Sequence, residues 1–171
     1  MSGSQAWLTV RNTRMNPFGG DRTSWTTEIS HDDLLLQEVD IDRDIDHDWG
    51  ILECEYRHES HVIQLPAEEL SGLQRLVSQI DFDLLQEACS DCIDDVGWQA
   101  IECRTSDLLL KYRGHLLWGW HDIRNSTSPH IHVVKTAVEL WETVVRLSPF
   151  KDLVRPRPQK RPRGPGRYRN S

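Results

Sequence analysis

The segment Pro66-Ala-Glu-Glu-Leu-Ser-Gly-Leu-Gln-Arg-Leu-Val-Ser-Gln79 is where the chain changes from a strand pattern to a helix pattern. Leu70, Leu73 and Val77 recur at three- and four-residue spacing, which places them on one stripe of a helix. Pro66 suits a first helical turn, and the two glutamates that follow complement the positive end of the helix dipole. The segment therefore predicts an amphipathic helix over its whole length.

The residues before this helix alternate apolar and polar side chains, which is typical of short strands. Turn residues such as Asn16-Pro17 and Gly19-Gly20 separate them. Four or five strands are therefore expected before the first helix. The predicted strands are Ala6–Arg11, Trp25–Ile29, Leu34–Val39 and a hairpin of Gly50–Tyr56 with His61–Leu65 around Arg57–Ser60.

After the helix, residues 82–88 predict a helical turn and residues 98–103 a strand. Residues 107–112 and 115–120 predict a second hairpin, with Arg113-Gly114 as a two-residue turn because glycine accepts a positive φ. A last amphipathic helix begins near Val133 and stops before Pro149.

Strands in runs with isolated helices between them indicate an α+β fold. We expect a mainly antiparallel sheet of six to eight strands with the two amphipathic helices on one face. A chain of 171 residues is long enough for one ordinary domain. The predicted organisation is one acidic domain over residues 1–154, followed by a tail over residues 155–171.

Charge supports this division. Residues 1–154 carry 13 lysines and arginines against 27 acids, whereas residues 155–171 carry seven basic residues and no acid. The tail is rich in Pro and Gly and lacks apolar residues, so we expect it to be flexible. A basic tail attracts polyanions, which predicts contact with nucleic acid or an acidic protein. The predicted contact residues are Arg155, Arg157, Lys160, Arg161, Arg163, Arg167, Tyr168 and Arg169.

Trp118-Gly119-Trp120 places two indoles on the same face of the predicted strand 115–120. Flat aromatic faces of this kind stack on sugar rings, bases or apolar protein surfaces. The alternative is that both rings pack in the core beneath the helix that carries Trp141. Trp118 and Trp120 are therefore candidate partner-binding residues.

Cys89-Ser-Asp-Cys92 is a C-x-x-C motif, and Cys54 and Cys103 complete a set of four thiols. Four thiolates at about 2.3 Å are a structural zinc site. Cys54 and Cys103 stand singly inside predicted strands, however, and the alternative is that the cysteines are buried, reduced core thiols. Cys89 and Cys92 are therefore zinc candidates.

Acids alternate with other residues through Asp40–Asp48, which in a strand aligns carboxylates along one face. With Asp42 as position 1, acids stand at positions 3, 5 and 7 and Glu53 stands at position 12, as in a calcium-binding loop. Position 6 is His47, so the glycine of the sharp turn is missing. The alternative is an acidic ribbon that docks a basic partner. The calcium candidates are Asp42, Asp44, Asp46 and Glu53.

His130-Ile-His132 predicts two imidazoles on one side of a strand, as a metal or general-base candidate. The sequence contains no G-x-S-x-G, no phosphate-binding glycine loop and no H-E-x-x-H. The N-terminus lacks the regions of a signal peptide, and no apolar run is long enough to span a membrane. A cytoplasmic protein without a membrane partner is therefore expected.

Together these features predict a non-enzymatic binding or adaptor protein, or an accessory subunit of a larger assembly, without a cofactor. The acidic domain is expected to contact a protein partner, and the tail nucleic acid or an acidic partner. One alternative is an inhibitor or immunity protein whose acidic face meets a basic enzyme cleft. The other is a metal-dependent enzyme that uses the acidic ribbon or the histidines.

Overall fold

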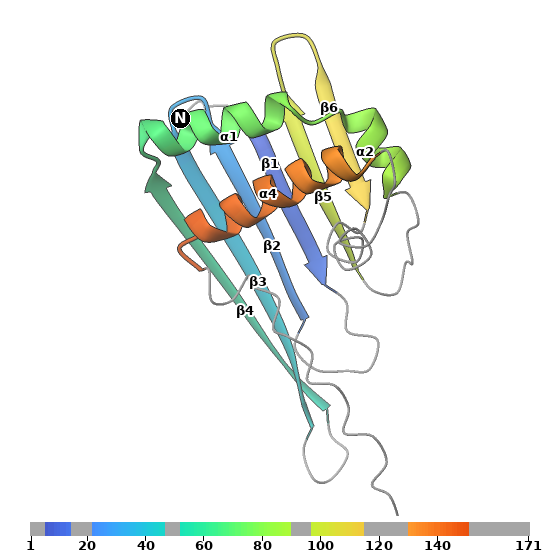
Figure 1. Cartoon of the computed structure of the whole chain (residues 1–171). Coiled ribbons are helices and arrows are strands. Elements are labelled where there is room, and N and C mark those ends of the chain that lie inside the picture. Colours follow the sequence, from blue (N-terminus) through green and yellow to red (C-terminus); the bar gives the residue numbers. More distant parts are fainter. Residues whose placement is uncertain (1–5, 15–21, 47–51, 90–96, 115–129, 151–171) are drawn as a thin grey trace, which may run out of the picture.

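The computed structural model describes residues 6–14, 22–46, 52–89, 97–114 and 130–150, which form a curved sheet with helices on one side (Figure 1). The predicted strand 115–120 and the predicted tail 155–171 lie outside these residues. The strands are β1 (Ala6–Arg14), β2 (Arg22–Ser30), β3 (Leu34–Asp46), β4 (Leu52–Gln64), β5 (Gly97–Arg104) and β6 (Leu109–Gly114), and the helices are α1 (Ala67–Ser78), α2 (Phe82–Ala88) and α4 (Ile131–Leu147).

The described strands form one six-stranded sheet in the order β4-β3-β2-β1-β5-β6. Every neighbouring pair is antiparallel. Strands β1 to β4 follow one another as a meander, whereas β5 joins the far side of β1 and pairs Cys103 with Leu8. The α+β class and the mainly antiparallel sheet predicted from the sequence are confirmed.

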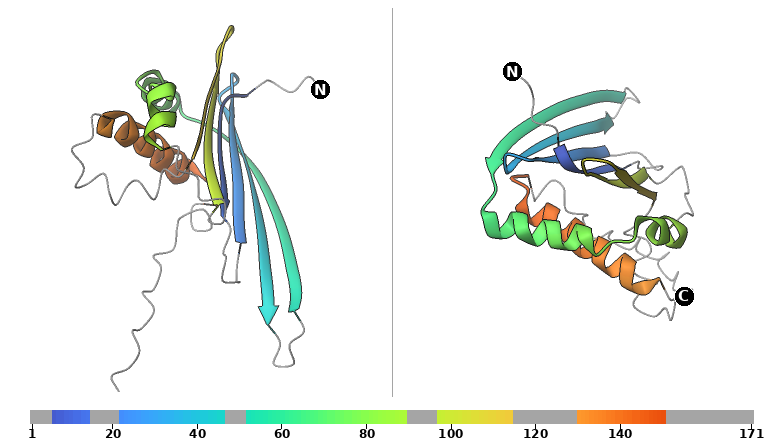
Figure 2. Two further views of the ribbon diagram at one scale, coloured as in Figure 1. Left: turned by 90° about the vertical axis from the view of Figure 1, so that its right-hand side faces the viewer. Right: turned by 90° about the horizontal axis from the view of Figure 1, so that it is seen from above.

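The three helices that the structure describes lie on the same face of the sheet, which we call the covered face (Figure 2). Strand alternation sends one set of side chains towards them, and these side chains are buried. The amphipathic stripe of α4 meets this set, so the core forms between one layer of helices and one layer of sheet. Its central members are Leu8, Val10, Trp25, Ile29, Leu35, Val39 and Ile101 from the sheet and Val134, Ala137, Val138, Trp141 and Val144 from α4.

A buried polar contact links the end of α4 to the sheet. The Gln37 amide nitrogen donates to the Thr27 hydroxyl at 3.0 Å, and the Ser148 hydroxyl donates to the Gln37 carbonyl oxygen. Gln37 and Thr27 are almost fully buried, so each polar group must find a partner inside the protein. This contact fixes the C-terminal end of α4 over β2 and β3.

A second contact joins the two long helices at the surface. The Arg146 guanidinium donates two hydrogen bonds to the Glu69 carboxylate, at 2.8 and 2.7 Å. This pair holds the pKa of Glu69 below its usual value and raises the pKa of Arg146. A two-point contact of this kind adds orientation to the α1–α4 packing.

The helices agree closely with the sequence pattern. Helix α1 spans Ala67–Ser78 with Pro66 as its N-cap, and α2 spans the predicted residues 82–88. The Asp81 carboxylate caps α2 by accepting a hydrogen bond from the Leu84 amide at 3.0 Å. The two predicted amphipathic helices and their position on one face are confirmed.

Two predicted turns are wrong. Arg57–Ser60 lies inside β4, which runs unbroken for 13 residues and pairs with β3 along its whole length. Arg113 and Gly114 lie at the end of β6, paired with Ala100 and Gln99. The turn that the structure describes beside β6 precedes this strand, where the Thr105 amide donates to the Leu108 carbonyl oxygen at 2.9 Å.

Candidate functional site: the open face of the sheet

The face of the sheet opposite the helices, here called the open face, is covered by none of the described helices or strands (Figure 2). Cross-strand partners lie on the same face of a sheet, so the strand register determines which side chains lie on the open face. Polar and charged residues predominate. Its described side chains include Thr9, Arg11 and Thr13 on β1, Thr26 and Glu28 on β2, Glu38, Asp40 and Asp42 on β3, Tyr56, His58 and Val62 on β4, Trp98 and Glu102 on β5, and Lys111 and Arg113 on β6.

Charge on the open face is divided between its two halves. Strands β2 and β3 contribute acids, and β1, β5 and β6 contribute mainly bases. Among the described side chains, the acidic half holds Glu28, Glu38, Asp40 and Asp42, and the basic half holds Arg11, Arg104, Lys111 and Arg113. Glu102 is the acid of the basic half and lies 3.5 Å from the Arg11 guanidinium.

The acidic half contains a hydrogen-bonded cluster of Asp40, Tyr56 and His58. The register places His58 directly opposite Asp40 and Tyr56 opposite Asp42. The Tyr56 hydroxyl donates to Asp40 Oδ1 at 2.5 Å, and His58 Nδ1 lies 2.8 Å from the same oxygen, where it is the donor because a carboxylate only accepts. Tyr56 is 66% exposed, so the cluster lies at the surface.

These contacts shift the pKa of all three groups. The Tyr56 hydroxyl, with the His58 ring, lowers the pKa of Asp40 below 3.8. Asp40 in turn raises the pKa of Tyr56 above 10.0 and that of His58 above 6.5. The cluster is therefore an ionised aspartate that favours protonated neighbours.

The His58–Asp40 contact predicts a pH-dependent contribution to stability. The raised pKa of His58 makes its contribution complete below pH 6.5 and lost as pH rises through the folded-state value. The lowered pKa of Asp40 makes its contribution complete above pH 3.8 and lost as pH falls through the folded-state value. His58→Gln should therefore lower the free energy of unfolding at about pH 5 and have a smaller effect at about pH 9.

Urea unfolding at both pH values measures this difference. His31→Gln is the matched control, because His31 is an exposed histidine in the turn between β2 and β3. An effect of His58→Gln that is equal at the two pH values would contradict the assignment.

The basic half carries one stacked pair. The Arg113 guanidinium carbon lies 4.3 Å from the centre of the Trp98 ring, which is the geometry of a cation–π contact. Both residues lie on the open face, where β5 and β6 pair. This contact orders two large side chains at the basic end of the surface.

The predicted acidic ribbon is part of β3. Strand β3 continues to Asp46 and pairs with β4, with Asp44 opposite Cys54 and Ile45 opposite Glu53. The far end of this hairpin extends beyond the helices (Figure 1). Asp42–Asp46 is thus extended backbone, whereas a calcium-binding loop curls around its ion. Asp48 lies outside the described residues.

The cysteines that the structure describes occupy two places. Cys89 is the C-cap of α2, and Cys103 is buried in β5. Burial raises the pKa of both thiols, although a hydrogen bond with the Tyr112 hydroxyl opposes this shift at Cys89. Cys92 lies outside the described residues, as does the Cys54 side chain. Within the described ranges, no three metal-binding side chains gather in one place.

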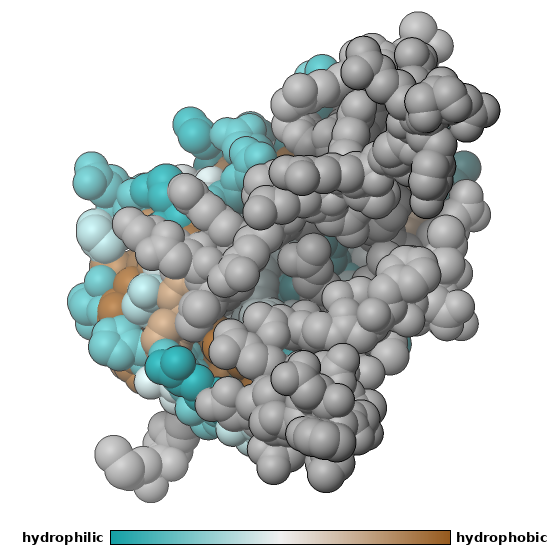
Figure 3. All heavy atoms as spheres, turned by 90° about the horizontal axis from the view of Figure 1, so that it is seen from below, coloured by the Kyte–Doolittle hydropathy of each residue, from teal (hydrophilic) through white to brown (hydrophobic). Residues whose placement is uncertain are grey.

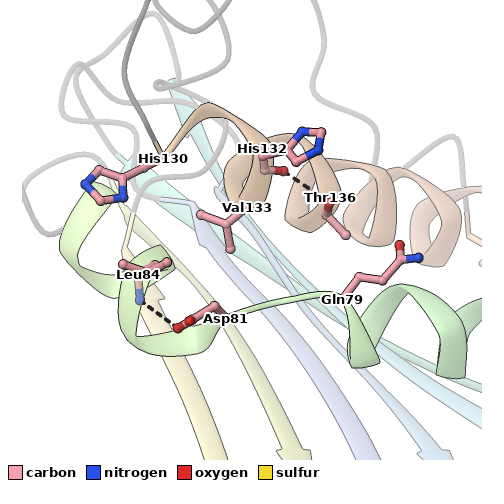
Figure 4. Close-up of a pocket in the computed structure, with 7 residues that line it drawn as sticks. All are labelled: Gln79, Asp81, Leu84, His130, His132, Val133 and Thr136. Atoms are coloured by element: carbon pink, nitrogen blue, oxygen red, sulfur yellow. Dashed lines mark hydrogen bonds between the residues drawn. The ribbon is translucent and has the colours of Figure 1, made fainter.

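A pocket of about 420 Å³ lies where the end of α1 and the starts of α2 and α4 meet (Figure 4). His130 is the N-cap of α4 and His132 lies in its first turn, so the predicted strand is wrong. The two imidazoles project in different directions. The Thr136 hydroxyl donates to the His132 carbonyl oxygen at 3.1 Å. The pocket is lined by Gln79, Asp81, Leu84, His130, His132, Val133 and Thr136.

The candidate partner-binding residues from the sequence fall elsewhere. Trp118, Trp120 and the basic residues of 155–171 lie outside the described residues. The Asp40–Tyr56–His58 cluster and the basic half of the open face were not predicted from the sequence. Both depend on strand register. The two wrongly predicted turns replaced paired strand residues of β4 and β6, so this register could not be assigned from the sequence.

A scan against protein-family models gives no match, and a search of curated proteins finds no similar sequence. None of the helices in the described ranges is long and apolar enough to cross a membrane. Seen from below, the described residues show mainly hydrophilic side chains with smaller hydrophobic patches between them (Figure 3).

Proposed function

We propose that this protein is a non-enzymatic binding protein, an adaptor or accessory subunit that docks the acidic half of its open sheet face on a basic protein surface. The observation that carries the proposal is the division of charge on that face. Four described carboxylates stand on adjacent strands β2 and β3, and the described bases of the face stand on β1, β5 and β6.

The chemistry of the face suits docking. Complementary potentials steer two proteins together and suppress wrong partners. A charge division across one surface also fixes orientation, because a partner turned by half a revolution would meet like charges. Tyr56 and Val62, which are 66% and 53% exposed, supply apolar contact area beside the acids.

The basic tail is a second binding element in this proposal. Its seven basic residues and lack of acids support salt-sensitive contact with nucleic acid or with an acidic protein. In this arrangement the folded domain supplies specificity, and the tail supplies affinity that falls as salt rises.

A specific observation favours inhibition as a second candidate function. The far end of the β3–β4 hairpin extends beyond the helices, and β3 carries acids at every second position from Asp40 to Asp46. A projecting acidic hairpin has the shape and charge to enter a basic enzyme cleft. An inhibitor would abolish the activity of its partner, whereas an adaptor would leave that activity in place.

The experiment compares the full-length protein with two double variants in a pull-down from lysate at low and moderate salt. Glu38→Lys/Asp42→Lys reverses charge on the open face, and Glu139→Lys/Glu142→Lys reverses charge on the exposed side of α4. We expect a specific partner that the first variant loses and the second retains. Equal capture by both variants would refute the open face as the docking site.

Two further arms assign the contribution of the tail. A 1–154 truncation and nuclease treatment are applied to the same pull-down. A protein partner that survives both binds the folded domain, and a partner lost in either arm depends on the tail or on nucleic acid. The captured protein is then assayed for its own activity, which separates the adaptor from the inhibitor.

A further inference from the structure

Strand β4 forms one edge of the sheet. It runs for 13 residues, Leu52–Gln64, and among the described strands it pairs only with β3. At about 3.3 Å per residue its free edge is roughly 40 Å long. Such an edge presents a row of backbone N–H and C=O groups to which another strand can add. It contains no proline, so every residue keeps its backbone donor.

A second copy of the chain is the simplest strand donor, and symmetry restricts how it can bind. A two-fold axis perpendicular to the sheet reverses strand direction and keeps the same face upwards. The two β4 strands then pair antiparallel, and the helices of both copies lie on the same side. Pairing along all 13 residues places His58, the middle residue of Leu52–Gln64, opposite itself.

Charge complementarity favours this register. With His58 at the centre, Arg57 of each copy stands opposite Glu59 of the other, so the contact occurs twice. Within one chain the Arg57 guanidinium already contacts the Glu59 carboxylate, and the Arg57 side chain remains 65% exposed. Opposite charges at facing positions stabilise strand pairing.

The neighbouring registers that keep the same faces aligned are electrostatically unfavourable. A centre at Arg57 would place Arg57 opposite itself and Glu55 opposite Glu59. A centre at Glu59 would place Glu59 opposite itself and would remove the Arg57–Glu59 contacts between the copies. Like charges at facing positions destabilise strand pairing. Of these three registers, the charge sequence of β4 favours the one that also pairs the whole strand.

We infer that two copies of this protein associate by antiparallel pairing of their β4 strands centred on His58, forming one continuous sheet with the helices of both copies on one side. The pairing uses the backbone edge of β4 with Arg57 and Glu59, whereas the proposed partner binding rests on the carboxylates of β2 and β3. It also places the two acidic halves on either side of the central β4 pair.

Sedimentation analysis of the full chain, with Arg57→Glu and Glu59→Arg variants, tests the inference. The wild type should be dimeric. Each single variant faces two like-charge pairs across the axis, so its dimer dissociation constant should rise about tenfold or more. An equimolar mixture of the two variants should restore the dimer, because each glutamate of one chain then meets an arginine of the other.

The mixture separates contact between chains from contact within a chain. In both single variants the Arg57–Glu59 pair within the chain stays broken after mixing, so a merely local effect would not be rescued. Lys111→Glu on β6, at the opposite edge of the sheet, is the matched control and should remain dimeric. Circular dichroism establishes that each variant is folded. A monomeric wild type, or a mixture that fails to associate, would overturn the inference.

A cross-link tests the register separately. Because residue 58 faces itself across the axis, His58→Cys should form a disulfide-linked dimer under mild oxidation. Ser71→Cys, exposed on α1, is the control position, and the wild type reports any cross-linking by the four native cysteines. Cross-linking of the Ser71→Cys variant to the same extent as the His58→Cys variant would contradict the proposed axis.

Discussion

Gly114→Ala is expected to lower the free energy of unfolding by about 3 kcal/mol or more. A Cβ atom at this position would overlap the Cys89 carbonyl oxygen and lie 2.5 Å from the Tyr112 hydroxyl oxygen and 3.0 Å from its Cζ. Neither group can move easily, since Tyr112 is 1% exposed and the carbonyl belongs to the backbone that ends α2. Urea unfolding followed by circular dichroism measures the loss.

Gly72→Ala is the matched control. Nothing lies within 4 Å of a Cβ atom at Gly72, which occupies the interior of α1. Alanine is the better helix former, so this variant should gain about 0.5–1 kcal/mol. A Gly114→Ala protein as stable as the wild type would show that β6 does not approach α2 as closely as described.

Trp141→Ala should be the second severe substitution, with an expected loss of about 3–5 kcal/mol. The Trp141 ring packs on that of Trp25, with ring centroids 4.9 Å apart, and both side chains are at most 3% exposed. Removal of the indole leaves a cavity between α4 and the centre of the sheet. The same unfolding assay applies.

Glu139→Ala tests whether any change to α4 has this effect. Glu139 is exposed on the same helix, and its substitution should change stability by no more than about 0.5 kcal/mol. Similar losses for the two variants would mean that the Trp25–Trp141 contact contributes little.

The helices could be predicted because their signals are local. The stripe of Leu70, Leu73 and Val77 spans about two turns of α1, and Asp81 caps α2 through a residue three positions away. The apolar stripe of α4 likewise repeats within one segment. Each helix therefore carries in its own residues the information that defines it.

The sheet was predicted less well because its strands depend on distant partners. Arg57–Ser60 is polar enough to read as a turn, but β3 supplies a partner for each of these residues. Gly114 suggested a turn with positive φ, whereas the structure requires glycine there for the close approach of α2. A glycine can serve either purpose, and sequence alone does not separate them.

The candidate site shows the same dependence. Asp40 and His58 are 18 positions apart and meet only because the β3–β4 register is fixed along both strands. The acidic ribbon could be seen in the sequence. Its hydrogen bonds to Tyr56 and His58 could be predicted only from the strand register. The division of charge across the open face needed the order of all six described strands.

The strand order also implies an order of folding. The β1–β4 meander brings together residues near in sequence, so its loop-closure cost is low, whereas β5 must find β1 across α1 and α2. During synthesis, one edge of β1 has no partner among the described strands until β5, which contains Cys103, has left the ribosome. Until α4 follows, the apolar side of the meander also lacks its main cover. The nascent chain is therefore most exposed to aggregation in the interval between β4 and α4.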